Sequence, residues 1–108
     1  MDYTTEKHTM NQIWLEPWGA VSESQKAALR NELQAEVTFH HPLFGLQLEP
    51  IGRNFANDDV LFTGEGNKLV AVHLTWSGAG DQRYPSTEFF DTWSEFTDEK
   101  MVVDNLGY

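Results

Sequence analysis

The sequence contains no cysteine. This absence excludes disulfide bridges, thiolate zinc sites and cysteine nucleophiles together, and it fits a reducing compartment. The chain also lacks an apolar run near the roughly 18 residues that a membrane span requires. Its first residues, Met1 to Lys7, lack the basic and then apolar layout of a signal peptide. We therefore expect a cytoplasmic protein that does not enter a membrane.

Basic residues are scarce as well. Seven lysines and arginines stand against 17 aspartates and glutamates, which gives a net charge of −10. Such a surplus of negative charge repels nucleic-acid phosphate and anionic lipid, and it favours binding to basic partners or simply keeps the protein soluble. We expect no nucleic-acid partner and no membrane partner.

Large apolar side chains are plentiful. Hydrophobic residues make up 40% of the chain, including seven Phe, four Trp and three Tyr. This content is too high for a disordered protein, and 108 residues fit a single domain. We expect one α+β domain over residues 1–108, in which the polar and unpatterned residues 1–12 form a flexible arm.

The clearest local pattern is Lys68 to Trp76, which is rich in β-branched and apolar residues and predicts a central strand. Alternation divides this strand into two faces. The core face holds Val70, Val72, Leu74 and Trp76. The other face holds Leu69, Ala71, His73 and Thr75, and the sequence leaves open whether it is covered.

Further strands are predicted on both sides of this run. A strand over about Leu46–Phe55 contains Pro50, which indicates a sheet edge or a bulge. It reverses into Val60–Thr63, and the turn Gly64–Asn67 leads into the central strand. Ser86–Phe90 fits a short strand or the entry to a helix, and we favour the strand. An antiparallel meander of three to four strands follows.

Two helices are predicted to pack on this sheet. The first begins near Ser22 or Ser24 and ends near Val37, and the second begins after a cap at Asp91 or Thr92 and runs to about residue 103. We expect both helices mainly to cover the face of Val70, with Trp93 and Phe96 meeting that face. Trp14 and Trp18 are expected to be buried in a short extended segment, and an exposed aromatic clamp is the alternative.

No catalytic constellation, cofactor motif or metal-ligand spacing is present. His40 and His41 are neighbours, so an extended backbone points them to opposite sides. Asp58 and Asp59 belong to an ordinary turn sequence. The segment Ser77–Gly80 lacks the residues of a phosphate loop or a nucleophile elbow. We assign no catalytic residue, no metal and no cofactor.

One candidate ligand site remains in the sequence. If the His73 face of the sheet is open, His73 and Thr75 line a shallow groove. His41 and Trp18 are further candidates for binding a ligand there. If that face is covered, His73 is a hydrogen-bonded structural residue. A small-ligand binder or an enzyme built on this open face is therefore one functional hypothesis.

The second helix offers a different kind of site. Its predicted outer face carries four acids, Asp91, Glu95, Asp98 and Glu99. This face is either a solvated surface or a docking surface for a basic protein, with Tyr84 as an aromatic anchor. We favour a non-catalytic protein-binding or regulatory module as the leading hypothesis, with the oligomeric state open.

Three stretches carry a family resemblance. Asp58–Phe62, His73–Gly78 and Ser86–Asp91 resemble stretches of small uncharacterised bacterial proteins, over about the C-terminal half of the chain. The resemblance implies a bacterial protein and no particular activity. Size, acidity and α+β layout are also similar to those of immunity proteins that neutralise bacterial toxins, which is an analogy of type rather than of motif.

Overall fold

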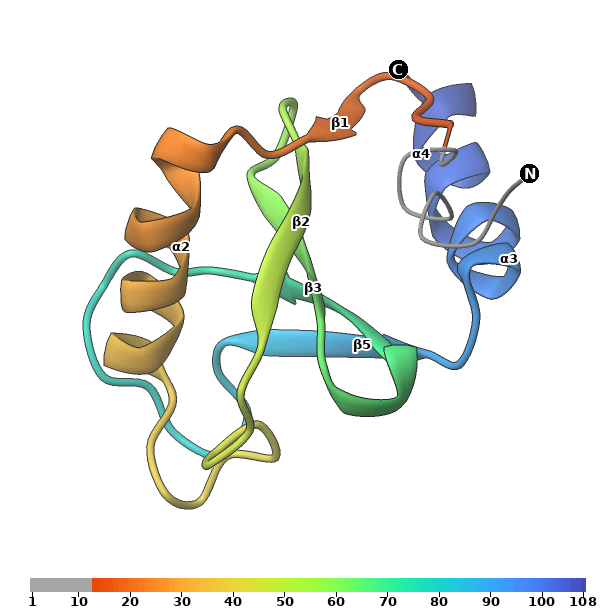
Figure 1. Cartoon of the computed structure of the whole chain (residues 1–108). Coiled ribbons are helices and arrows are strands. Elements are labelled where there is room, and N and C mark those ends of the chain that lie inside the picture. The colour runs from red at the N-terminus through yellow and green to blue at the C-terminus, as the bar shows by residue number, and fades with distance from the viewer. Residues whose placement is uncertain (1–12) are drawn as a thin grey trace.

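The computed structural model describes residues 13–108, so the predicted flexible arm lies outside the described residues. These residues form one antiparallel sheet whose five strands follow chain order (Figure 1). The strands are β1 (Trp18–Ala20), β2 (Glu49–Asn54), β3 (Asp59–Thr63), β4 (Leu69–His73) and β5 (Ser86–Phe90). The predicted α+β meander is confirmed, with five strands.

Two strand predictions are settled by this sheet. Ser86–Phe90 is a strand, as favoured. The register between β2 and β3 shifts between Pro50 and Gly52, which is the irregularity that a proline inside a strand indicates. The strand that was not predicted is β1. It has only three residues, which are too few for an alternation pattern to identify it.

The helices begin and end close to the predicted positions. Helix α2 (Glu23–Glu36) follows Ser22. The second helical region consists of α3 (Trp93–Phe96), a π-helical turn (Thr97–Met101) and α4 (Val102–Leu106). We call residues 93–106 the C-terminal helix. The hydroxyl of Thr92 caps it by accepting the N–H of Glu95 at 3.1 Å.

The two helices lie on opposite faces of the sheet (Figure 1), so the prediction that both cover one face is wrong. One cluster joins α2 to the sheet and contains Val21, Leu29, Leu33, Leu43, Val60, Phe62, Val70, Val72 and Leu74. The other joins the C-terminal helix to the opposite face and contains Trp18, Leu61, Leu69, Ala71, Phe90, Phe96 and Met101, with Trp93 packed against it. Trp93 and Phe96 therefore meet the face of Leu69 and Ala71.

The physical reason lies in the two central strands. Val60, Leu61 and Phe62 are consecutive and all buried, and so are Leu69 to Val72. Consecutive residues of a strand point to opposite faces, so an uninterrupted apolar run needs cover on both sides. A single layer of helices cannot provide it.

Trp76 also departs from its predicted place. Strand β4 ends at His73, and Trp76 is 51% exposed with a φ of 58°. This left-handed backbone conformation turns the chain out of the sheet. Leu74 stays in the core beside α2, but Trp76 does not belong to the core face.

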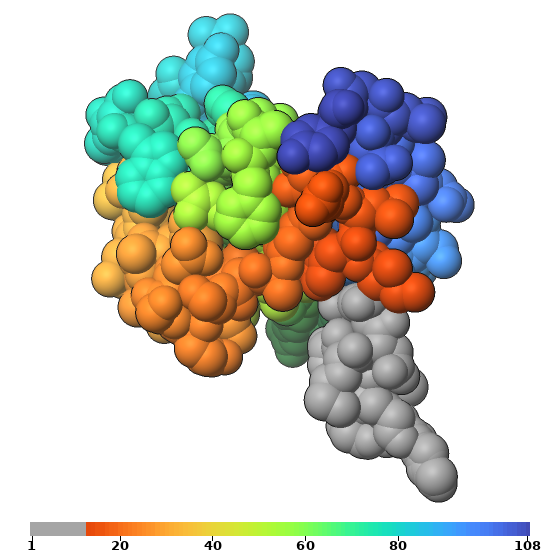
Figure 2. Space-filling model, turned by 90° about the horizontal axis from the view of Figure 1, so that it is seen from above, coloured from red at the N-terminus to blue at the C-terminus, as the bar shows by residue number. Residues whose placement is uncertain are grey.

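The described N-terminal segment packs against the end of the C-terminal helix, as the two colours at their junction in Figure 2 show. The indole N–H of Trp18 donates to Asp104 at 2.8 Å, and the Asn105 amide donates to the carbonyl of Glu16 at 2.7 Å. Trp18 and Phe96 meet edge to face with ring centres 5.0 Å apart. Within residues 13–108, no helix has the length and apolar character needed to cross a membrane.

Candidate functional site

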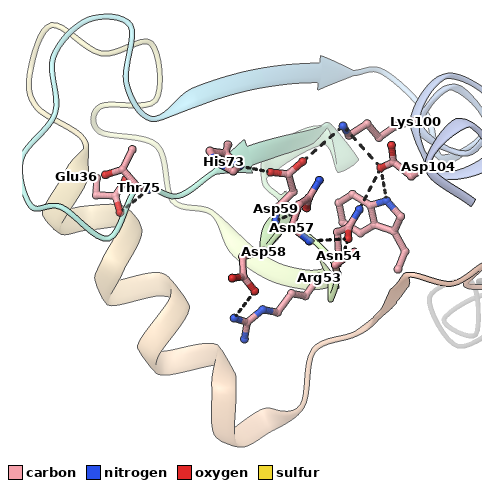
Figure 3. A network of polar contacts seen from close by, with 12 residues as sticks. Glu36, Arg53, Asn54, Asn57, Asp58, Asp59, His73, Thr75, Lys100 and Asp104 are labelled. Carbon is pink, nitrogen blue, oxygen red and sulfur yellow. Dashed lines mark hydrogen bonds and ion pairs between the residues drawn. The ribbon is translucent and has the colours of Figure 1, made fainter. Parts of the chain in front are cut away.

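The structure pairs His73 with a carboxylate that sequence analysis assigned to a turn. Asp59 at the start of β3 lies directly opposite His73 at the end of β4, so the two side chains share one face. His73 Nδ1 lies 2.5 Å from Asp59 Oδ1 (Figure 3). The histidine side chain is 56% exposed, whereas Asp59 is buried. Asp59 therefore fixes the imidazole at the rim of the sheet.

This pair continues into the C-terminal helix. Lys100 Nζ lies 3.5 Å from Asp59 Oδ2 and 3.7 Å from Asp104 Oδ2. The same Asp104 oxygen accepts the Trp18 indole N–H and, at 3.2 Å, an N–H of Asn54. Figure 3 shows this polar chain running from β4 to the helix. Its charges and hydrogen bonds connect the sheet to the C-terminal helix.

A hollow of about 120 Å³ opens beside His73. It is lined by Asp59, Ala71, His73, Ser86, Thr87, Glu88 and Lys100. Ser86 lies opposite His73 in the register of β4 and β5, as Asp59 does on the other side. Because Asp59 engages Nδ1, Nε2 is the ring nitrogen that is left for a ligand. The hollow can therefore offer hydrogen-bonding groups to a small molecule.

The other predicted ligand residues do not line this hollow. The N–H of Thr75 is bound by the carboxylate of Glu36, on the α2 side of the sheet. Trp18 is only 2% exposed and lies in the core. The prediction that it is buried is therefore confirmed, and it does not form an exposed aromatic clamp. Among the described residues, no group of three or more histidine and acidic side chains is placed to hold a metal ion.

His41 has a structural position. It is buried, its Nδ1 accepts the N–H of Leu43 at 3.0 Å, and its Nε2 lies 2.7 Å from the carbonyl of Pro85. Because Nδ1 must be an acceptor here, Nε2 carries the proton and donates to Pro85. His41 thus ties the loop after α2 to the segment before β5. His40, its neighbour, is exposed.

The acidic face predicted on the second helix divides into two halves. Asp98 and Glu99 are exposed on the C-terminal helix. Asp91 pairs with Lys68 at 2.8 Å, and Glu95 accepts the N–H of Asp91 at 2.8 Å. Asp91 and Glu95 therefore help to fix the junction between β5 and the helix. Asp91 is exposed as well, but its charge is paired with Lys68, so Asp98 and Glu99 are the two solvent-exposed acids of the helix itself.

Tyr84 is exposed, but it lies at the other end of β5. It precedes Ser86, whereas Asp91 follows Phe90. A five-residue strand is roughly 17 Å long at about 3.3 Å per residue. The structure therefore separates Tyr84 from the four acids.

Sequence analysis missed the buried carboxylate of Glu36. It accepts the N–H of Thr75 at 2.8 and 3.1 Å and that of Trp76 at 2.8 Å, and its side chain is fully buried. A signal was present, because Glu36 lies three and seven residues after Leu33 and Leu29, on the apolar stripe of α2. A charged residue at such a position indicates a buried hydrogen-bond partner.

Glu36 also interacts with Glu32, one turn earlier on the helix. A hydrogen bond to the Glu36 side chain, then burial and the Glu36 charge, raise the pKa of Glu32 from 4.5 to about 7. Burial by itself raises the pKa of Glu36, but the hydrogen bonds from Glu32 and from the N–H groups of Thr75 and Trp76 outweigh it and lower the pKa. These shifts favour one proton on Glu32 and none on Glu36 at pH values below about 7.

A larger groove lies on the α2 side of the sheet, beyond the helix. It has a volume of about 740 Å³ and is open to solvent along Phe89, which is 55% exposed. Its apolar lining consists of Leu43, Leu46, Leu48, Leu69, Val70 and Phe89. Sequence analysis predicted a strand from about Leu46 and no groove beside it.

No family model matches the chain, and no curated protein and no solved structure matches it either.

Proposed function

We propose that the protein is a non-catalytic binding module whose partner is a basic protein. The carrying observation is the distribution of charge. Five of the six basic side chains in residues 13–108 form ion pairs with acids of the same chain, namely Lys26, Arg30, Arg53, Lys68 and Lys100. The charge that is left over is negative, and it draws basic partners and repels acidic ones.

The C-terminal helix is the favoured docking surface. Asp98 and Glu99 are exposed in its π-helical turn, and Val103 and Leu106 are exposed along the following α4. Leu106 is 80% exposed, and Tyr108 directly after the helix is exposed as well. Apolar and aromatic anchors beside charges of one sign are a common composition of protein interfaces.

A capture experiment tests this proposal. The immobilised protein is exposed to native lysate at low and at raised salt, and the bound fraction is compared with that of the variant Asp98→Asn/Glu99→Gln. We expect captured partners to be basic, to dissociate as salt screens the charges, and to be weakened by the variant.

The matched control is Glu23→Gln/Glu49→Gln, which removes the same two charges from exposed acids at α2 and at the start of β2. Capture that is insensitive to salt contradicts the proposal. So does an equal loss in the two variants, because a docking surface on the C-terminal helix requires a local effect.

A second function is favoured by the hollow beside His73. There the Asp59 carboxylate orients the ring, and Ser86 and Lys100 line the same space. These groups suit a small ligand with hydrogen-bonding groups. The volume of about 120 Å³ limits such a ligand to a small molecule.

Chemical-shift titration with libraries of metabolites and divalent metals tests this second function. We expect a ligand to shift the amide resonances of His73 and Ser86. In His73→Ala the shift at Ser86 should disappear. A ligand response that is unchanged in His73→Ala contradicts a site at His73, whereas loss of that response together with normal capture of a basic protein separates the two functions.

A further inference from the structure

Strand β5 is the edge of the sheet on the side away from β1. Its one partner among residues 13–108 is β4, and three of its five residues, Ser86, Glu88 and Phe89, are exposed. Figure 1 shows it in light blue. An edge strand directs alternate backbone N–H and C=O groups outward, where a further strand can bind them.

The two faces of β5 differ in chemistry. Phe89 is opposite Val70 and lies on the α2 face, where it lines the apolar groove. Glu88 is opposite Ala71 and lies on the other face, where it lines the hollow with Asp59. On that face Asp59 is buried and paired with His73 and Lys100, so the exposed acid is Glu88. A strand that binds to this edge therefore meets apolar surface on one side and the Glu88 carboxylate on the other.

A second copy of the chain fits this edge poorly. In antiparallel pairing centred on β5, Glu88 of one copy lies opposite Glu88 of the other, and directly opposed like charges destabilise a strand pair. Each copy also carries a net charge of −10. A basic strand meets neither penalty.

We propose that β5 binds an extended basic segment of the partner by strand addition. The segment alternates basic and apolar residues, so that apolar side chains enter the groove along Phe89 and basic side chains lie beside Glu88. This inference rests on the proposed function, because it takes the partner to be basic. It adds a second contact surface for that partner, at β5 beside the C-terminal helix, and the sequence pattern that is recognised there.

A synthetic peptide that alternates lysine and valine over seven residues is the probe. Two controls accompany it: a peptide of the same composition with its lysines and valines in separate blocks, and an alternating glutamate and valine peptide. We expect the lysine and valine alternation to bind best and to slow amide hydrogen exchange within residues 86–90. Binding of both lysine peptides with equal affinity overturns the proposal, because the alternation is then not recognised.

Charge reversal at the edge provides the second arm. We expect Glu88→Lys to weaken binding of the lysine and valine peptide by roughly fivefold or more and to strengthen binding of the glutamate and valine peptide. The control Glu23→Lys changes the net charge equally on α2 and should leave both affinities unchanged. Glu88→Gln is a milder change that removes the charge without reversing it. Its affinity for the lysine and valine peptide should lie between those of wild type and Glu88→Lys. Equal effects of Glu88→Lys and Glu23→Lys overturn the proposal.

The remaining outcomes separate this inference from the proposed function. Salt-sensitive binding that protects only the C-terminal helix overturns strand addition and leaves the basic partner in place. Protection of residues 86–90 that rises with protein concentration in the absence of peptide assigns the edge to a second copy. Failure of every peptide to bind overturns strand addition, whereas the proposed function is decided by the capture experiment with Asp98→Asn/Glu99→Gln.

Discussion

The carboxylate of Glu36 accepts the backbone N–H of Trp76 at 2.8 Å, across 40 residues of sequence. The backbone carbonyl of Glu36 also accepts the N–H of Gly80 at 2.8 Å. The last residue of α2 therefore fixes the chain at two points as it leaves β4. This explains why the predicted strand stops early and why Trp76 turns outward.

Replacing Glu36 by alanine should destabilise the protein by about 2 to 4 kcal/mol. The substitution leaves the N–H groups of Thr75 and Trp76 without their acceptor and opens a cavity at a fully buried position. Urea denaturation measures the loss. The control Gln34→Ala changes an exposed residue of the same helix and should stay within about 0.5 kcal/mol. A similar small loss for Glu36→Ala would show that water replaces the carboxylate.

Stability should depend on pH through Glu32. Its pKa is about 7 in the folded protein against 4.5 as the ordinary value, so the folded state holds its proton more tightly. The stabilisation from this group is therefore fully present below about pH 4.5 and is lost as the pH rises through about 7. The pKa of Glu36 is lowered, so its contribution is present above 4.5 and is lost at more acidic pH.

The variant Glu32→Gln isolates this effect, because its amide donates to Glu36 at every pH. We expect the urea midpoint of the variant to match that of wild type near pH 5 and to exceed it near pH 8. Other titrating groups are common to both proteins and cancel in the difference. A difference that does not change between pH 5 and pH 8 would show that Glu32 does not share a proton with Glu36.

The fold was predictable where one pattern determines one element. The apolar run of β4 and the stripe of Leu29 and Leu33 on α2 both lead to the elements observed. The placement of the helices was not predictable from β4 alone, because its second face mixes Leu69 and Ala71 with the polar residues His73 and Thr75. The unbroken apolar run Val60 to Phe62 in β3 carried the missing information.

The Asp59–His73 pair shows why the site was harder to predict than the fold. Thr63 pairs with Leu69, which leaves five residues in the hairpin loop and sets Asp59 opposite His73. The predicted loop of four residues, 64–67, pairs Thr63 with Lys68 and sets Asp59 opposite Val72. A slip of one residue moves a side chain to the other face of the sheet. The observed loop holds Gly66 and Asn67 at positive φ, which the sequence pattern does not specify.

Phe96→Ala should cost about 3 to 5 kcal/mol, and Trp93→Ala should cost less. Phe96 is fully buried and packs edge to face on Trp18 and Phe90. Trp93 is half-buried and packs at the rim against Trp14. Chemical denaturation of both variants gives the two losses. A larger loss of stability for Trp93→Ala than for Phe96→Ala would show that Trp93, and not Phe96, contributes most to this core.

Gly52 and Trp14 should show strong coupling. A Cβ atom added at Gly52 would lie 2.2 Å from Cη2 of the Trp14 indole, so Gly52→Ala must displace that ring from its contact with Trp93. We expect Gly52→Ala to destabilise by about 1 to 3 kcal/mol and to shift the tryptophan fluorescence. Gly107→Ala, where the added atom has ordinary contacts at 3.9 Å, is the control and should be nearly neutral.

The coupling is measured by a double-mutant cycle. In the background Trp14→Ala the indole is absent, so Gly52→Ala should cost little or should stabilise β2, where alanine loses less backbone entropy than glycine. An interaction energy of about 1 kcal/mol or more supports the close contact. Equal costs of Gly52→Ala in the two backgrounds would show that glycine is required by the strand backbone, at the register shift beside Pro50, rather than by the ring of Trp14.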